Sequence, residues 1–199
     1  EHTVILYREL KRIDIVNRIT KDKTYDVEEL YYAFPFGVES PRFHFELGGA
    51  VIEGERDMFP CANRNWISVQ RWVDASNDKW GVTWAPVEAP LVTPCSLSDR
   101  WMQPFPAKNG TLFSLLMTNV WSTNYKAGQW GDFTFRYAIT SHEGPLNGIA
   151  ATSFGREVAR PLVTCILAEN QSGPLPGKSW SFGEIEGRGV VLQALKRAE

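Results

Sequence analysis

The chain has 199 residues, a size that fits one domain with a substantial hydrophobic core. Its formal net charge is -2, and it has no long basic run, so nucleic acid is not expected as a partner. No apolar run approaches the ~20 residues of a membrane-spanning helix, so no membrane partner is expected either.

Alternating apolar and polar residues predict β-strands along most of the chain. The pattern is clearest over 132–140, where the odd-numbered residues are apolar, as in an antiparallel strand with one buried face. In chain order, the predicted strands cover 3–7, 13–19, 42–47, 66–74, 80–92, 111–120, 132–140 and 189–195. Turn signals separate these runs, and no long helical period is present. The prediction is therefore an all-β antiparallel sandwich.

One short helix is predicted over 152–159, where Pro161 would end it. Both ends of the sequence are strand-like and abrupt, and a large antiparallel sheet would need further strands beyond them. We therefore expect residues 1–199 to form a single β-sandwich domain that belongs to a longer protein.

The three cysteines match neither a disulfide framework nor a metal-binding motif, because they are widely spaced and odd in number. Cys165 lies in an apolar run, which predicts a buried thiol. A bridge between Cys61 and Cys95 is possible on sequence grounds.

The residues that could carry catalysis are sparse. His2, His44 and His142 do not form a ligand array for zinc, and His44 is expected on the solvent side of its strand. Asp74 follows a strand-like run, where an aspartate commonly caps a turn. A serine nucleophile in a Gly-x-Ser-x-Gly turn is absent from the sequence. We therefore predict no catalytic residue and no metal ligand in this chain.

Two segments rich in aromatic and amide residues, 63–66 and 119–126, are candidates for a sugar-binding surface. Flat rings stack on the C–H faces of sugars, and amides bond to hydroxyl groups. The alternative is that Trp66, Trp72 and Trp121 are packed rings and that the amides cap turns. The predicted substrate-binding residues are Arg64, Arg71, Trp121, Asn124 and Tyr125. We expect Arg64 to orient a carboxylate of a neighbouring domain, outside this chain, through a bidentate pair.

Five ordered segments of the chain resemble the C-terminal β region of glycoside hydrolase family 38, the retaining α-mannosidases. These segments are 31–36 (YYAFPF), 69–77 (VQRWVDASN), 81–92 (GVTWAPVEAPLV), 119–127 (NVWSTNYKA) and 133–137 (FTFRY). The resemblance extends from about residue 11 to residue 198. Cys61, Ala75 and Trp130 depart from the family pattern, which affects local packing and turn shape more than the assignment.

The resemblance implies a large antiparallel super-sandwich, similar to the galactose mutarotase fold. It also implies that zinc, the nucleophilic aspartate and the acid carboxylate belong to an N-terminal catalytic domain outside this chain. No cofactor is then expected in this chain. Its partners would be that catalytic domain and a mannose-containing oligosaccharide whose terminal α-mannosides are hydrolysed.

Two other functions remain open on the sequence alone. The chain could be an independent carbohydrate-binding module, which its loop tryptophans and tyrosines would support. It could also be an autonomous enzyme similar to mutarotases, which use a histidine and a glutamate on a similar sandwich. The lack of a convincing histidine in a sugar-shaped site argues against that second alternative.

Overall fold

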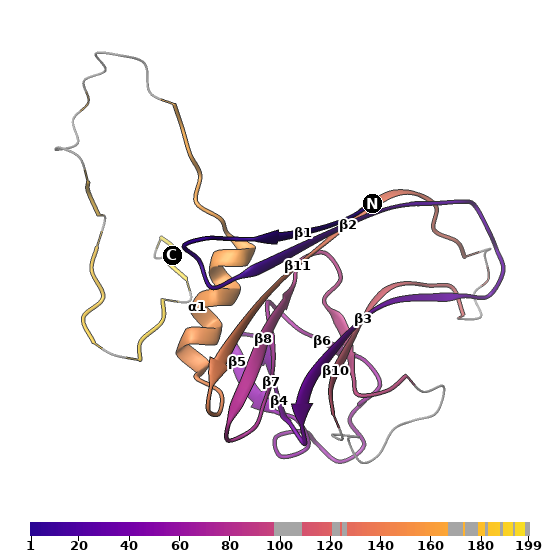
Figure 1. Ribbon diagram of the computed structural model, residues 1–199, viewed down its shortest axis with the longest axis horizontal. Helices are drawn as coiled ribbons and strands as arrows, with labels where there is room; N and C mark the ends of the chain where they lie inside the picture. The colour runs from indigo at the N-terminus through magenta and orange to yellow at the C-terminus, as the bar shows by residue number, and fades with distance from the viewer. Residues whose placement is uncertain are drawn as a thin grey trace.

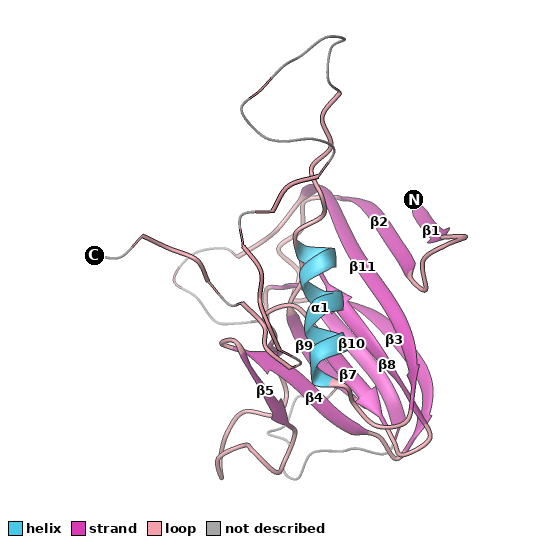
Figure 2. Ribbon diagram, turned by 90° about the vertical axis from the view of Figure 1, so that its left-hand side faces the viewer, coloured by secondary structure: helices cyan, strands magenta, loops and turns pink. Residues whose placement is uncertain are grey.

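The computed structural model describes residues 1–97, 109–120, 124, 127–166, 173, 179–181, 183–187, 189–192 and 194–197. In this part of the chain the fold is a sandwich of two antiparallel sheets with one helix on its outside (Figures 1 and 2), which confirms the all-β prediction. The elements are β1 (His2–Leu6), β2 (Ile13–Lys21), β3 (Glu29–Glu39), β4 (Arg42–Leu47), β5 (Ala50–Glu53), β6 (Ile67–Ser68), β7 (Val73–Ser76), β8 (Trp80–Pro86), β9 (Leu91–Pro94), β10 (Asn109–Thr118), β11 (Gly131–Glu143) and α1 (Gly148–Ala159).

The two sheets differ in width. The wider sheet has seven strands in the order β1-β2-β11-β8-β7-β4-β5, and the narrower sheet has four in the order β3-β10-β9-β6. In the wider sheet β2 pairs with β11, although more than 100 residues of chain separate them. The centre of this sheet is therefore assembled from distant parts of the sequence.

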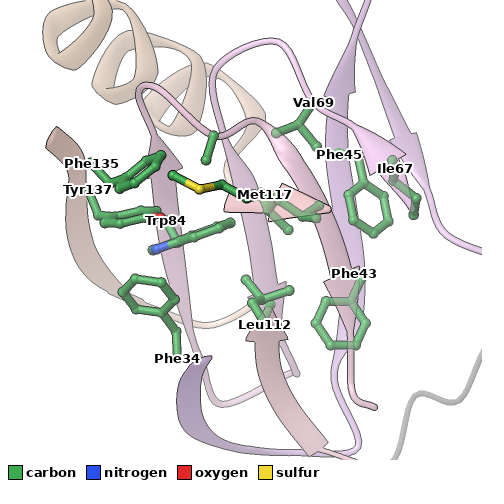
Figure 3. Packing of buried hydrophobic residues seen from close by; sticks show 14 residues of the cluster. Phe34, Phe43, Phe45, Ile67, Val69, Trp84, Leu112, Met117, Phe135 and Tyr137 are labelled. Carbon is green, nitrogen blue, oxygen red and sulfur yellow. The ribbon is translucent and has the colours of Figure 1, made fainter. Parts of the chain in front are cut away.

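Alternating side chains fill the space between the sheets (Figure 3). The odd-numbered residues of β11 point into this core, as the sequence pattern predicted, and Tyr137 stacks on Trp84 with ring centroids 5.6 Å apart. The hydroxyl of Tyr137 donates to Ser114 Oγ at 3.0 Å on the opposite sheet. Burial raises the pKa of Tyr137, so this phenol stays protonated and links the two sheets.

Two of the predicted strands are each divided in the structure. The run 66–74 contributes β6 to the narrow sheet and β7 to the wide one, and 80–92 likewise divides into β8 and β9. The backbone bonds locate the first crossing, since Val69 N donates to Pro90 O whereas Gln70 N donates to Glu46 O. Continuous apolar runs therefore reflect burial in two successive sheets rather than one long strand.

Two predictions about the C-terminal part of the chain are wrong. Cys165 is exposed rather than buried, and the described residues of 189–195 form no strand. The reason is the same in both regions: an extended segment becomes a strand only when a neighbouring strand pairs with its backbone. Residues 161–166 have no such neighbour among the described residues. Cys61 and Cys95 do not form a disulfide with each other.

The helix α1 begins four residues earlier than predicted because Asn147 caps it. Its side-chain oxygen accepts from Ile149 N at 3.2 Å and from Ala150 N at 3.1 Å. Phe154 packs against Ala85 and Ala138 on the outer face of the wide sheet, which α1 covers (Figure 2). Within the described residues, no helix combines the length and apolar character needed to cross a membrane.

Candidate functional site

A row of polar side chains crosses the outer face of the wide sheet. Strand register aligns Thr140 on β11, Thr83 on β8, Asp74 on β7, His44 on β4 and Glu53 on β5. Their sequence neighbours on the same strands point into the sandwich core, so alternation directs these five residues to the opposite face. The sheet therefore places Thr83 on one side of Asp74 and His44 on the other, with Thr140 and Glu53 at the two ends of the row.

Asp74 is the centre of this row and is 0% exposed. Its carboxylate accepts from Ser76 Oγ at 2.6 Å, from Thr83 Oγ1 at 2.9 Å and from His142 Nε2 at 2.8 Å. Burying a charged group is costly unless hydrogen bonds compensate it, and these three donors do so. The prediction that Asp74 caps a turn is wrong, because Asp74 lies within strand β7 and is buried.

His44 also differs from its prediction, since it lies in the row beside Asp74 and is largely buried rather than facing solvent. Its Nδ1 lies 4.0 Å from Asp74 Oδ1, and its Nε2 lies 3.7 Å from Glu53 Oε2. Burial lowers the pKa of His44, although the charges of Asp74 and Glu53 act in the other direction. His44 is therefore neutral at pH 7.

Gly81 permits the contact between His142 and Asp74. It lies between Ser76 and His142 in the register, one row away from Asp74. A Cβ at this position would come within 2.7 Å of His142 Nε2, and closer still to Ser76 Cβ. The His142 ring therefore passes over the glycine to reach the carboxylate, beside the Cβ of Ser76, which explains a glycine in the middle of the sheet.

The cluster positions its members rather than presenting a free base. With Asp74 as a carboxylate, Nε2 of His142 carries the proton, because a carboxylate only accepts. The other ring nitrogen, Nδ1, is buried and has no partner among the described residues. Neither nitrogen is thus available to activate a nucleophile in this conformation.

The family resemblance assigns its zinc to a catalytic domain outside this chain. Among the described residues, no group of three or more histidine, cysteine, aspartate or glutamate side chains is placed to hold a metal ion. Of the carboxylates in the polar row, Asp74 accepts from Ser76, Thr83 and His142, and Glu53 pairs with Arg56. No chemical step through a metal is derived for this chain.

The two arginines predicted to bind substrate form bidentate pairs with carboxylates of this chain. Arg64 donates to Glu55 Oε1 at 2.6 Å and Oε2 at 3.3 Å, and to Ala62 O at 2.9 Å. Arg71 donates to Glu46 Oε1 at 2.5 Å and Oε2 at 2.9 Å. The bidentate geometry expected for Arg64 is present, but its partner lies within the domain. A contact of either arginine with substrate stays a prediction.

The remaining predicted residues belong to the segment 119–126. Asn124 is exposed, whereas Trp121 and Tyr125 lie outside the described residues. The first residue of this segment, Asn119, is anchored by its side chain. Its Oδ1 accepts from Glu28 N at 2.7 Å, and its Nδ2 donates to Asp26 O at 2.7 Å. A sugar-binding role for this segment stays a prediction.

The other tryptophans proposed for a sugar surface have packing roles. Trp72 is completely buried beneath α1, where a Cβ on Gly155 would lie 2.6 Å from its ring. Trp66 donates from Nε1 to the Tyr31 hydroxyl at 3.1 Å. Burial raises the pKa of Tyr31 to about 12, so its hydroxyl remains protonated. For these two rings the packing alternative describes the structure.

Sequence reasoning missed Ser76, Thr83 and His142 as a group around Asp74. A signal for part of it was present, because Asp74 and Ser76 are two residues apart on one strand and so share a face. His142 is 68 residues away from Asp74 in the chain and gave no local signal. Searches against models of protein families and against curated proteins found no match to this chain.

Proposed function

We propose that this chain is the β-sandwich domain of an α-mannosidase similar to glycoside hydrolase family 38. It would pack on a catalytic domain that precedes it in the same polypeptide and shape the cleft in which terminal α-mannosides of oligosaccharides are hydrolysed. The ordered segments of resemblance support this proposal. Two of them, 69–77 and 81–92, contain all of β7 and all but the first residue of β8, which pair at the centre of the wide sheet.

The observation that carries the proposal is an uncovered inner face at the β1 edge of the wide sheet. Val4 lies opposite Ile15 and Leu6 lies opposite Ile13, so these four side chains share the face that further along the sheet lines the core. Leu6 is nevertheless 74% exposed and Val4 is 51% exposed. The seven-stranded sheet extends here beyond its four-stranded partner, which leaves apolar side chains without cover.

A catalytic domain is the occupant that we propose for this face. Contiguous exposed apolar side chains mark surfaces that another protein surface covers, and an open edge strand needs protection from unwanted pairing. The strand β1 is an edge strand of the wide sheet (Figure 1), so the uncovered face is open to a domain placed beside it. Side chains of the catalytic domain would then cover the apolar residues of β1 and β2 that the narrow sheet leaves exposed.

The experiment uses the complete polypeptide that contains this chain, with 4-nitrophenyl α-D-mannopyranoside as substrate. We expect hydrolysis of the α-mannoside and none of the β-mannoside. Leu6→Asp should lower kcat/KM about tenfold or more, because a carboxylate would be buried between the domains. Ile5→Asp is the matched control, since Ile5 lies on the opposite face of the same strand and should change kcat/KM little.

Two results would overturn the proposal. A complete polypeptide without α-mannosidase activity would remove the assigned reaction. Equal effects of Leu6→Asp and Ile5→Asp would show that the inner face is not specifically covered, and the docking geometry would have to be abandoned.

A further inference from the structure

A hollow of about 570 Å³ lies where the β7–β8 turn meets the β3–β4 turn. Its lining includes Glu39 and Ser40 from one turn, and Asp78, Lys79 and Trp80 from the other. The side chain of Trp80 is 37% exposed, although tryptophan usually buries most of its surface. The hollow therefore combines an accessible indole ring with carboxylate, ammonium and hydroxyl groups.

Asn77 holds the two turns together. Its Oδ1 accepts from Lys79 N at 2.9 Å and from Trp80 N at 3.1 Å, which shapes the tip of the β7–β8 hairpin. Its Nδ2 donates across to Glu39 O at 3.0 Å on the other turn. The backbone of the hollow is thus set by internal bonds before any ligand arrives, which lowers the entropic cost of binding.

Several polar groups of the hollow remain available to a ligand. Among the described residues, no hydrogen bond or ion pair engages the Glu39 carboxylate, the Ser40 hydroxyl or the Lys79 ammonium group. By contrast, Asp78 is paired with Arg42 at 2.5 Å. The available groups therefore offer hydrogen-bond acceptors and donors side by side, next to a flat apolar ring.

The charges at the hollow cancel. The carboxylates of Glu39 and Asp78 are matched in number by the cations of Lys79 and Arg42, so the formal sum is zero. A phosphate or other anion would meet two carboxylates, and an organic cation attracted to the indole ring would meet two basic groups. A neutral ligand that both donates and accepts hydrogen bonds is the best match.

We propose that this hollow binds a neutral pyranose, with one C–H face of the sugar stacked on Trp80. Sugar hydroxyls donate to the Glu39 carboxylate, accept from the Lys79 ammonium group, and exchange either role with Ser40. This site goes beyond the proposed packing role, which requires no sugar contact from the chain itself. The chain would then hold sugar at a place that the α-mannosidase reaction alone does not demand.

The test is a calorimetric titration of the chain with three probes, methyl α-D-mannopyranoside, methyl β-D-glucopyranoside and methyl β-D-galactopyranoside, at millimolar concentration. We expect saturable binding of at least one probe. Trp80→Ala should weaken it at least about tenfold, whereas Trp80→Phe, which keeps a ring, should retain much of it. Trp130→Ala is the matched control, because Trp130 is also exposed, at 47%, but makes an edge-to-face contact with Tyr25 elsewhere on the surface.

Glu39→Gln provides a second variant that leaves the hairpin intact and should also weaken binding, because it replaces an ionised acceptor with a neutral amide. Absence of binding by all three pyranosides would overturn the proposal, as would binding that survives both Trp80→Ala and Glu39→Gln. Tighter binding of tetramethylammonium than of any sugar would assign the hollow to cations instead. The α-mannosidase assay of the complete polypeptide does not enter this test, so either proposal can fail without the other.

Discussion

Replacing Gly81 with alanine tests whether His142 must pass over this position, beside Ser76, to reach Asp74. The added Cβ would lie within 2.7 Å of His142 Nε2 and closer still to Ser76 Cβ, and the serine Cβ is fixed by its strand backbone. At least one of the two side chains must therefore move away from the carboxylate. Asp74 would keep its bond from Thr83 Oγ1 at 2.9 Å and lose one or two of the others.

The expected loss follows from leaving a buried carboxylate with fewer donors. Each hydrogen bond removed from a buried charged group costs roughly 1–3 kcal/mol, and the steric clash adds to this. We therefore expect Gly81→Ala to lower the free energy of unfolding by about 3–5 kcal/mol, in the range seen when a buried charged network is broken. Urea titration followed by tryptophan fluorescence measures this difference.

Gly37→Ala is the matched control for this measurement. Gly37 lies within β3, and a Cβ there would have no atom within 4 Å. Its replacement should change the free energy of unfolding by less than about 1 kcal/mol. If Gly81→Ala costs no more than Gly37→Ala, the close approach of Ser76 and His142 to Gly81 does not exist as described.

Two further predictions concern the other charged groups of the wide sheet. Because folding lowers the pKa of His44, the unfolded chain binds more protons than the folded chain below about pH 6.5. The free energy of unfolding should therefore fall as the pH drops through the folded pKa of His44. His44→Gln should flatten this pH dependence, and an unchanged slope from pH 7.5 to pH 5 in the variant would contradict the prediction. Arg71→Met would leave the carboxylate of Glu46 buried without its partner and should cost about 3–5 kcal/mol in urea titration. Arg18→Met, which breaks an exposed pair with Glu1, should cost at most about 1 kcal/mol, and equal costs would refute the distinction.

Strand positions were largely predictable because alternation is a local consequence of having one buried face. The predicted runs 13–19, 42–47 and 132–140 all fall within β2, β4 and β11. The helix was also found, but it starts four residues before the predicted range, because Asn147 caps it. An asparagine before a glycine can belong to a turn or cap a helix, and only the bonds of its side chain decide between them.

The division of 66–74 and of 80–92 between two sheets was not predictable in the same way. A segment that is buried on both faces has a continuous apolar run, whether it forms one strand in one sheet or crosses from one sheet to the other. The crossing near Val69 depends on bonds to Pro90 and Glu46, which lie far from it in the sequence. Local pattern has no access to such partners.

By itself, the sequence determined the fold class and the faces of the main strands, since both depend on the spacing of apolar residues along the chain. Only the tertiary structure decided what Asp74, His44 and His142 do. Their meeting requires the register of β4, β7, β8 and β11, which fixes rows across the sheet. Register arises from pairing between distant segments, so residues that look like a turn cap and a solvent-facing histidine become neighbours in a buried polar row.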